Sequence, residues 1–223
     1  MTWELDHVFF AASDADSVEV VLTQFGLTFT DRRIHHGQGT ANACANFENA
    51  FFELLRAHDL EELGADIVRP LGLDERIRWR ETGACPFGLC FRPSDAPTDT
   101  GVWPFETWGY EAAYVPRGTS IPIVTPRWAL GEPLVFVSNR SKSPVSGSNT
   151  GSRLHCGTPR TLTRVEVLRT DRSPVSAGVQ WFVERGFFSL RHGSEFILKL
   201  EWNHGCEGKS HRFPPGLPIV LHW

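Results

Sequence analysis

His7 and Glu53 are the residues of this chain whose types and spacing suit a metal ion. His7 lies in the alternating segment 5–10, Glu53 lies in segment 50–55, and a helical pattern separates them. A repeated strand–helix–strand–strand–strand unit can close a curled sheet around a pocket, and both side chains point inward if their chain neighbours face the other side. Imidazole nitrogen and carboxylate oxygen suit a divalent ion that keeps open positions for a substrate.

A degenerate copy of the same unit occurs near the end of the chain, with strands expected at 162–167 and 195–201. Arg164 falls at the position of the first ligand, and Lys199 or Glu201 falls at that of the second. Lys199 and Glu201 share strand parity, so both can face one cavity. A cationic side chain does not coordinate a metal, so the C-terminal copy lacks a metal ligand at the position of Arg164. Lys199 is instead a candidate substrate contact.

Two interpretations of these groups stay open. In the first, His7, Glu53 and Glu201 bind a metal ion together with water molecules. In the second, His7 and Glu53 are relics that hydrogen-bond each other or pair with Arg164 in a buried polar network. The Arg164 guanidinium suits a carboxylate or phosphate, so it could anchor an anionic or polar-oxygen ligand with an apolar body. An ion pair of Arg164 with Glu53 or Glu166 is the alternative.

A second polar cluster surrounds two glycines. His36, Gln38, Thr40 and Asn42 are spaced by two residues, which places them on one face if they lie in a strand. Short polar runs beside glycine are usually turns, so hairpin chemistry is the favoured interpretation. The functional interpretation makes His36 and Asn42 ligand contacts at the rim of the pocket.

The elements that must position these residues follow from the pattern of apolar residues. A helix is expected to begin near Ser13 and to end at Gly26, since glycine readily takes the left-handed conformation at a helix end. Strands are expected before and after it, at 3–11, 27–34, 40–47 and 50–56. The order β-α-β-β-β defines a first module over residues 1–57.

The rest of the chain divides into two parts. Residues 58–160 form either a degenerate middle module or an insertion, with strand-like runs at 87–92, 110–115 and 134–137, and Glu106 and Glu111 are its nearest ligand candidates. The Ser/Gly/Pro-rich stretch 138–160 predicts a linker or mobile loop. Residues 161–223 form a C-terminal module with a helix starting near Ser173 and strands near 187–191, 195–203 and 217–222.

Composition narrows the class of protein. The net charge of −4 and the pI of about 6.1 argue against a nucleic-acid binder. No apolar run is long enough to predict a membrane span, and no signal peptide is recognisable at the start. Five cysteines without a C-x-x-C pair fit reduced thiols in a cytoplasmic protein. The eight Trp and sixteen Phe suit an aromatic-lined cavity or a well-filled sheet interior.

Three motifs carry a family resemblance: Asp6-His7-Val8, the run His36-Gly37-Gln38-Gly39-Thr40-Ala41-Asn42, and Phe52-Glu53-Leu54-Leu55. Together they resemble the glyoxalase-like branch of the vicinal oxygen chelate (glyoxalase/bleomycin resistance/dioxygenase) superfamily. The resemblance implies paired βαβββ modules in an open barrel. In its enzymes the first strand of a module supplies a His or Gln ligand and the fourth a Glu, positions that His7 and Glu53 match. Some members bind no metal and only sequester a drug.

The expected fold is therefore α+β, with paired βαβββ modules forming a curled mixed β-sheet, an open barrel with helices on the outside. The expected function is that of a metal-dependent lyase, isomerase or dioxygenase acting on a small oxygen-rich substrate. The alternative is a metal-free protein that binds or sequesters a small hydrophobic or anionic compound. The cofactor is a divalent ion such as Zn, Fe, Mn or Ni, or none. Because such modules often pair across chains, a homodimer or a structural role is a further hypothesis.

Overall fold

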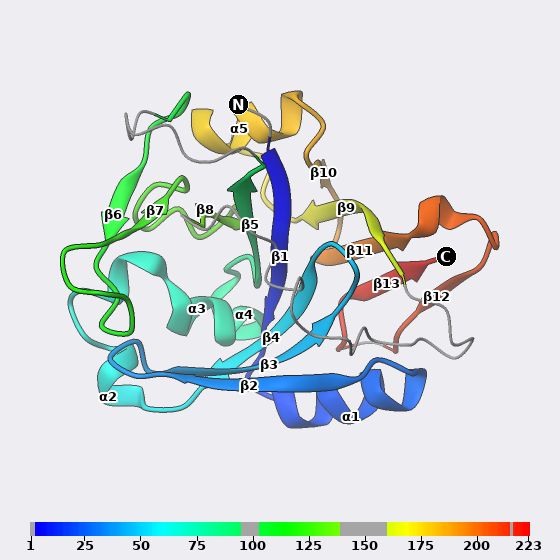
Figure 1. The fold of residues 1–223 in the computed structure, drawn as a ribbon, viewed down its shortest axis with the longest axis horizontal. Coiled ribbons are helices and arrows are strands. Elements are labelled where there is room, and N and C mark those ends of the chain that lie inside the picture. The colour runs from blue at the N-terminus through cyan, green and yellow to red at the C-terminus, as the bar shows by residue number, and fades with distance from the viewer. Residues whose placement is uncertain (1–2, 95–102, 139–159, 215) are drawn as a thin grey trace.

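The computed structural model describes residues 3–94, 103–138, 160–214 and 216–223. They form an α+β fold built from two mixed β-sheets that do not close into a barrel (Figure 1). This confirms the expected fold class. Within these residues no helix is both long and apolar enough to traverse a lipid bilayer.

The first sheet is strongly curled and has eight strands in the order β2-β3-β4-β1-β5-β8-β7-β6. Their bounds are β1 (Trp3–Ala11), β2 (Phe29–His35), β3 (Thr40–Asn46), β4 (Phe51–Ala57), β5 (Phe87–Pro93), β6 (Trp108–Tyr110), β7 (Ile121–Ile123) and β8 (Leu134–Val137). β1 pairs parallel with β4 and antiparallel with β5, and β5 pairs parallel with β8. The strands β1-β4-β3-β2 on one side of the β1–β5 pair therefore have the same arrangement as β5-β8-β7-β6 on the other side.

This repetition identifies the partner of the first module. The middle segment supplies β5 to β8, so it completes the curled sheet, and the C-terminal part does not. Gly88 on β5 shows how closely the halves approach, because a Cβ atom there would lie 2.0 Å from the ring of Phe9 on β1. Which segment completes the sheet was left open by the sequence.

The C-terminal part forms a second sheet in the order β10-β9-β11-β13-β12. Its strands are β9 (Leu162–Arg169), β10 (Ser189–His192), β11 (Ile197–Trp202), β12 (Ser210–Arg212) and β13 (Ile219–His222), with the short helix η2 (Asn203–Gly205) after β11. β10 follows α5 (Ala177–Glu184) and pairs parallel with β9 itself. In the first module the strand after the helix lies at the far edge, so the C-terminal unit has a different strand order.

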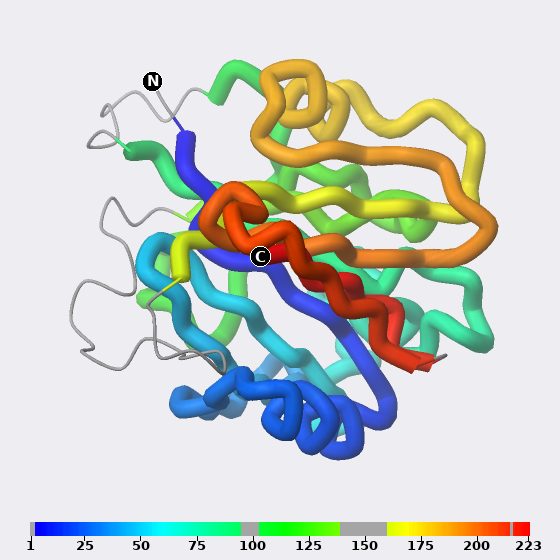
Figure 2. The backbone as a smooth tube through the Cα atoms, turned by 90° about the vertical axis from the view of Figure 1, so that its right-hand side faces the viewer, coloured from blue at the N-terminus to red at the C-terminus, as the bar shows by residue number. Residues whose placement is uncertain are grey.

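The convex face of the first sheet packs on the second sheet. Alternate residues of β1, such as Val8 and Phe10, share one buried core with residues such as Val165, Leu198 and Trp202 of the second sheet. Helices α1 (Ala15–Phe25) and α5 lie at opposite ends of this second sheet (Figure 2). Burial of each large apolar side chain contributes about 1.5–3 kcal/mol, so this interface is a major source of stability.

Short helices lie on the concave side of the curled sheet (Figure 1). They are α2 (Leu60–Leu63), η1 (Arg69–Leu71) and α3 (Leu73–Ile77). The next helix, α4 (Trp79–Thr82), packs its Trp79 against the core shared with the second sheet. Leu63, Leu71, Leu73 and Ile77 pack with Phe9 in a second core. These helices close one end of the concave face and leave the rest accessible.

Most expected elements are present, with instructive differences. The helix after Ser13 ends at Gly26, which has a left-handed φ of 116°, although the preceding Asp14 makes no side-chain cap. The strand expected at 110–115 ends at Tyr110, where a turn begins. Strands β7 and β12 were not predicted, because each has only three residues and alternation is hard to see in so short a run. The stretch 138–160 lies outside the described residues except for its two ends.

Arg76 holds the concave-side helices to the sheet. It is 1% exposed, and its guanidinium donates to the carbonyl oxygens of Leu71, Cys85, Ala129 and Glu132 at 2.7–3.3 Å. These carbonyls belong to segments far apart in the sequence. Without the guanidinium, buried carbonyl groups would lack hydrogen-bond partners.

We predict that Arg76→Met lowers the free energy of unfolding by about 3 kcal/mol, measured by urea denaturation, because several buried carbonyls lose their donors. The matched control is Arg69→Met, since the Arg69 side chain is 59% exposed. That control should change stability by less than about 0.5 kcal/mol. Equal stability of the two variants would contradict the structural role of Arg76.

Candidate functional site

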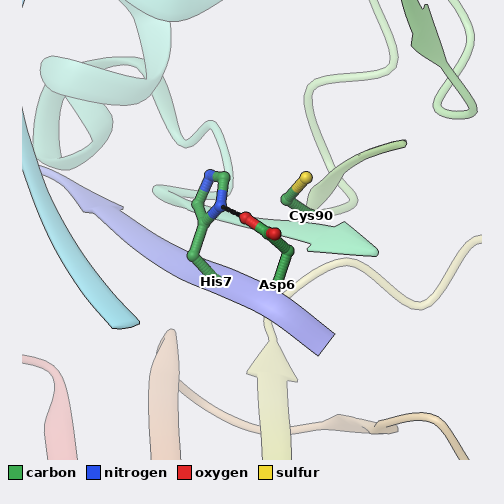
Figure 3. A group of neighbouring side chains, drawn as sticks. All are labelled: Asp6, His7 and Cys90. Carbon is green, nitrogen blue, oxygen red and sulfur yellow. Dashed lines mark hydrogen bonds and ion pairs between the residues drawn. The ribbon is translucent and has the colours of Figure 1, made fainter. Parts of the chain in front are cut away.

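A β-bulge in β1 places two polar residues side by side. Leu5 is paired with Phe91 of β5 and His7 with Cys90, so Asp6 is the extra residue between two consecutive pairs. Regular alternation would send Asp6 and His7 to opposite faces. The bulge instead lets both face the concave side, where the thiol of Cys90 also lies (Figure 3).

The imidazole of His7 is held on three sides. Its Nδ1 lies 2.7 Å from Asp6 Oδ1. The ring of Phe51 stacks on it with 4.3 Å between centroids, and Phe136 approaches edge-on at 5.4 Å. These contacts fix the direction of Nε2, the nitrogen that remains for other partners.

Asp6 is a buried carboxylate with partners from both modules. Burial opposes its ionisation, but the hydrogen bond from His7 and the charges of His7 and Arg92 outweigh burial and lower the pKa of Asp6. Arg92 Nη1 lies 3.4 Å from Asp6 Oδ2, and Arg92 also pairs with Glu4 at 2.8 Å. The carboxylate therefore stays charged and accepts the Nδ1 proton of His7.

Glu53 on β4 faces His7 across the site. It is 6% exposed, and its Oε2 lies 3.4 Å from His7 Nε2. The other oxygen, Oε1, accepts a hydrogen bond of 2.6 Å from Asn42 Nδ2. Asn42 is held in turn, because its Oδ1 accepts from the backbone N–H of Arg33 at 2.9 Å.

The separation of His7 Nε2 and Glu53 Oε2 has a chemical consequence. If Asp6 accepts the Nδ1 proton, Nε2 either carries a second proton that faces the Glu53 carboxylate or presents a lone pair that a bound cation could share with Glu53. Their separation of 3.4 Å exceeds the usual N–H···O range of about 2.7–3.2 Å. Two metal–ligand bonds of about 2.1 Å at a tetrahedral angle would place the donor atoms about 3.4 Å apart.

These groups line a cavity of about 740 Å³ on the concave face. Its polar lining includes His7, His35, Gln38, Asn42 and Glu53. Its aromatic and aliphatic lining includes Phe9, Phe51, Phe136, Tyr110, Tyr114, Leu55, Leu71 and Leu73. A few polar groups among apolar walls are typical of a small-molecule site.

The second module adds little to a ligand set. The cavity-lining residues of β5 and β8 include Cys90, Leu134 and Phe136, without a second His–Glu pair among the described residues of these strands. Cys90 Sγ lies within 4.8 Å of ligand atoms of Asp6 and His7. Burial raises the pKa of Cys90 well above its usual value, so the thiol stays protonated unless a cation displaces the proton. The donor set thus fits an ion held by His7 and Glu53, with other positions left to solvent or substrate.

The structure does not bring Arg164, Lys199 and Glu201 to His7. They lie on the second sheet, on the face opposite the shared core, because Val165, Leu198 and Leu200 fill the core positions between them. Arg164 and Lys199 pair there with Glu166, at 3.7 Å and 2.6 Å. Glu201 instead accepts a hydrogen bond of 3.4 Å from the Thr163 hydroxyl. None of the three residues lines the cavity that contains His7 and Glu53.

Of the second polar cluster, Asn42 lines the cavity and His36 does not. Residues 36–39 form the turn, so His36 is exposed, and His35 is paired with Thr40 and faces inward. With residues 36–39 in the turn, His35 is the last residue of β2 and pairs with Thr40, the first residue of β3. This pairing would have pointed to His35, and not to His36, as the cavity residue. Asp6 was missed as well, because alternation predicts that it faces away from His7, and a bulge leaves no signal in a single sequence.

Comparisons with known proteins identify the family of this chain. A family model described as "Glyoxalase-like domain" matches residues 5–121, more than half of the chain. The chain belongs to this family, within the vicinal oxygen chelate superfamily. No curated protein matched the chain.

One of the solved structures similar to this chain supports the fold. A hypothetical protein from Staphylococcus aureus aligns over 99% of both chains with a TM-score of 0.56 and 12% identity. Methylmalonyl-CoA epimerase from Mycobacterium tuberculosis is 20% identical, with 60% of this chain and 85% of that chain covered and a TM-score of 0.35. Glyoxalase I from Zea mays is 13% identical, with 99% and 92% covered and a TM-score of 0.25. At 12% identity, the likeness to the Staphylococcus aureus protein concerns the fold alone.

We predict that Asp6→Asn destabilises the protein by about 2 kcal/mol at pH 7, because a buried charged hydrogen bond is lost. The pKa of Asp6 is lowered on folding from its ordinary value of 3.8. Its stabilisation is therefore present above that value and is lost as the pH falls through the lower folded value. Urea denaturation at several pH values should show the stability difference between the two proteins shrinking as the pH falls below 3.8.

The matched control is Asp66→Asn, since the Asp66 side chain is 99% exposed. It should match the unmodified protein throughout this pH range. A difference between Asp6→Asn and the unmodified protein that stays constant down to pH 2, or is absent at pH 7, would contradict the charged role of Asp6.

Proposed function

We propose that the cavity binds one divalent metal ion through His7 Nε2 and Glu53 Oε2, and that the protein is an isomerase or lyase for a small oxygen-rich substrate. The observation that carries this proposal is the 3.4 Å separation of two atoms that can both coordinate a metal and whose outer partners are already fixed. Asp6 orients His7, and Asn42 occupies the other oxygen of Glu53. A bound divalent ion would polarise neighbouring substrate oxygens and stabilise negative charge on them.

The donor set favours isomerase or lyase chemistry over oxygen activation. Non-haem iron dioxygenases commonly use two histidines and a carboxylate on one face of the metal. Here His7 and Glu53 are joined by no second neutral histidine at hydrogen-bonding distance from either, among the described residues. Proton transfer next to a polarised carbonyl requires only a Lewis acid, an acid–base group and a dry cavity.

The metal-free alternative has its own support. Phe136 and Leu134 occupy cavity positions on β8, and Phe51 stacks on His7. Two protein ligands rarely hold an ion tightly, whereas an aromatic-lined cavity retains apolar compounds without one. In that case the function is sequestration of a small hydrophobic or anionic compound.

We predict that chelator-treated protein takes up about one Zn²⁺, Mn²⁺ or Ni²⁺ per chain, measured by titration calorimetry and elemental analysis. His7→Ala or Glu53→Ala should weaken binding at least about 100-fold, because either change leaves one protein ligand. Controls of matched residue type are His36→Ala and Glu201→Ala, which lie outside the cavity lining. Binding should also weaken as the pH falls and the ligands become protonated.

Equal metal binding by all four variants would reject the proposed site. If the unmodified protein takes up no metal after reconstitution but binds an aromatic compound, the sequestration alternative is correct. An activity screen with thiol adducts of methylglyoxal and with catechols distinguishes the reaction classes, since ring cleavage consumes oxygen and isomerisation does not.

A further inference from the structure

A second histidine, His35 on β2, lines the same cavity as His7 and Glu53. It is 8% exposed, and burial lowers its pKa, with the charges of Arg33 and His7 acting in the same direction and Glu53 opposing them. His35 is therefore neutral at physiological pH. A neutral imidazole has one donor and one acceptor nitrogen, so its tautomer decides what it offers to a ligand.

A chain of hydrogen bonds behind His35 selects that tautomer. The Tyr114 hydroxyl donates to Gln38 Oε1 at 2.9 Å, and Gln38 Nε2 donates to Thr40 Oγ1 at 2.7 Å. Thr40 Oγ1 lies 3.0 Å from His35 Nδ1. The Thr40 hydroxyl is fully buried, and the contacts of the described residues give its proton no acceptor other than His35 Nδ1. Donation to Nδ1 places the imidazole proton on Nε2.

The opposite direction of this chain fits less well. With the proton on Nδ1, His35 would donate to Thr40, and the buried Thr40 hydroxyl proton would lack an acceptor among the contacts of the described residues. This arrangement would also rely on Asn42 Nδ2 as donor to His35 Nε2 across 3.5 Å, beyond the usual range of about 2.7–3.2 Å. His35 Nε2–H is therefore directed as a donor towards the cavity.

Arg33 lies two residues before His35 on β2 and also lines the cavity. Its guanidinium lies 5.6 Å from the centre of the Tyr114 ring. Arg32, a neighbouring cation of the lining, is engaged by Glu19, whereas no ion pair of Arg33 is found among the described residues. Arg33 thus offers a free guanidinium to an anion at the edge of the cavity.

We propose that His35 Nε2–H receives a carbonyl oxygen and that Arg33 receives a carboxylate of the same ligand, so the substrate class is a small carbonyl compound with a carboxylate and an apolar body. This inference rests on the proposed function and specifies its substrate. A neutral imidazole donor stabilises negative charge that develops on a carbonyl oxygen without first losing a proton to it. The apolar body would contact the walls formed by Phe9, Leu55 and Leu73.

The tautomer can be measured directly on the full, chelator-treated chain by long-range ¹H–¹⁵N correlation of histidine side chains. We expect the Nε2–H form for His35, assigned by its loss in His35→Gln. Thr40→Val should give a mixture of tautomers, while Thr119→Val, whose exposed hydroxyl bonds only locally, should not. An Nδ1–H form in the unmodified protein would overturn the inference.

Ligand binding provides the second readout, with phenylpyruvate as the probe and chemical-shift titration as the measurement. His35→Phe should weaken phenylpyruvate about five- to tenfold, because one hydrogen bond is lost, and His35→Gln, which keeps an N–H donor, should stay within about twofold. Arg33→Met should weaken phenylpyruvate and 3-phenylpropionate about tenfold but leave 4-phenyl-2-butanone unchanged. Spectral dispersion verifies that each variant is folded.

Absence of phenylpyruvate binding at millimolar concentration, or equal binding by the unmodified protein and the His35→Phe and Arg33→Met variants, would overturn the substrate class. The test of His35 can fail independently of the test of the metal site. Loss of metal uptake with an intact Nε2–H tautomer would reject only the metal site formed by His7 and Glu53. Normal metal uptake with an Nδ1–H tautomer would reject only the role of His35.

Discussion

The buried carboxylate of Asp6 is the interaction on which the site depends. It lies between His7 of the first module and Arg92 of the second, so it joins the two halves of the curled sheet at their shared β1–β5 seam. A buried charge is stable only when it is paired and hydrogen-bonded, and both partners are needed here. The same carboxylate determines which nitrogen of His7 faces Glu53. Stability of the seam and orientation of the imidazole are therefore two results of one contact.

The two faces of the curled sheet have separate roles because side chains alternate along a strand. Phe10 and Leu54 point to the core shared with the second sheet, while Phe9 and Glu53 point to the cavity. The second sheet, with α1 and α5 beside it, covers the convex face, so the concave face remains available for a ligand (Figure 2). Polar groups from four adjacent strands can then converge there without weakening the core.

The sequence predicted what alternation and local motifs determine. His7 and Glu53 were placed on one face, and the helix ending at Gly26 was located, because these follow from periodicity over a well-marked module. Asn42 was assigned to the rim of the cavity only in the alternative to a turn. Asp6 was missed since a bulge breaks that periodicity. His36 was chosen from a spacing of two residues that continues through the turn, although only the residues outside the turn lie in strands. Arg164 and Glu201 were assigned to the cavity from a repeated local pattern. Such a pattern cannot say which sheet a unit joins, and the short strands of the middle segment concealed the true partner.

The central claim is that one divalent ion lies between His7 Nε2 and Glu53 Oε2. An anomalous difference map from crystals grown with Zn²⁺ or Mn²⁺ tests it most directly. The account predicts a peak about 2.0–2.2 Å from both atoms, with the bond between Asp6 and His7 Nδ1 intact. A peak elsewhere in the cavity, or none while His7 donates directly to Glu53, would contradict it.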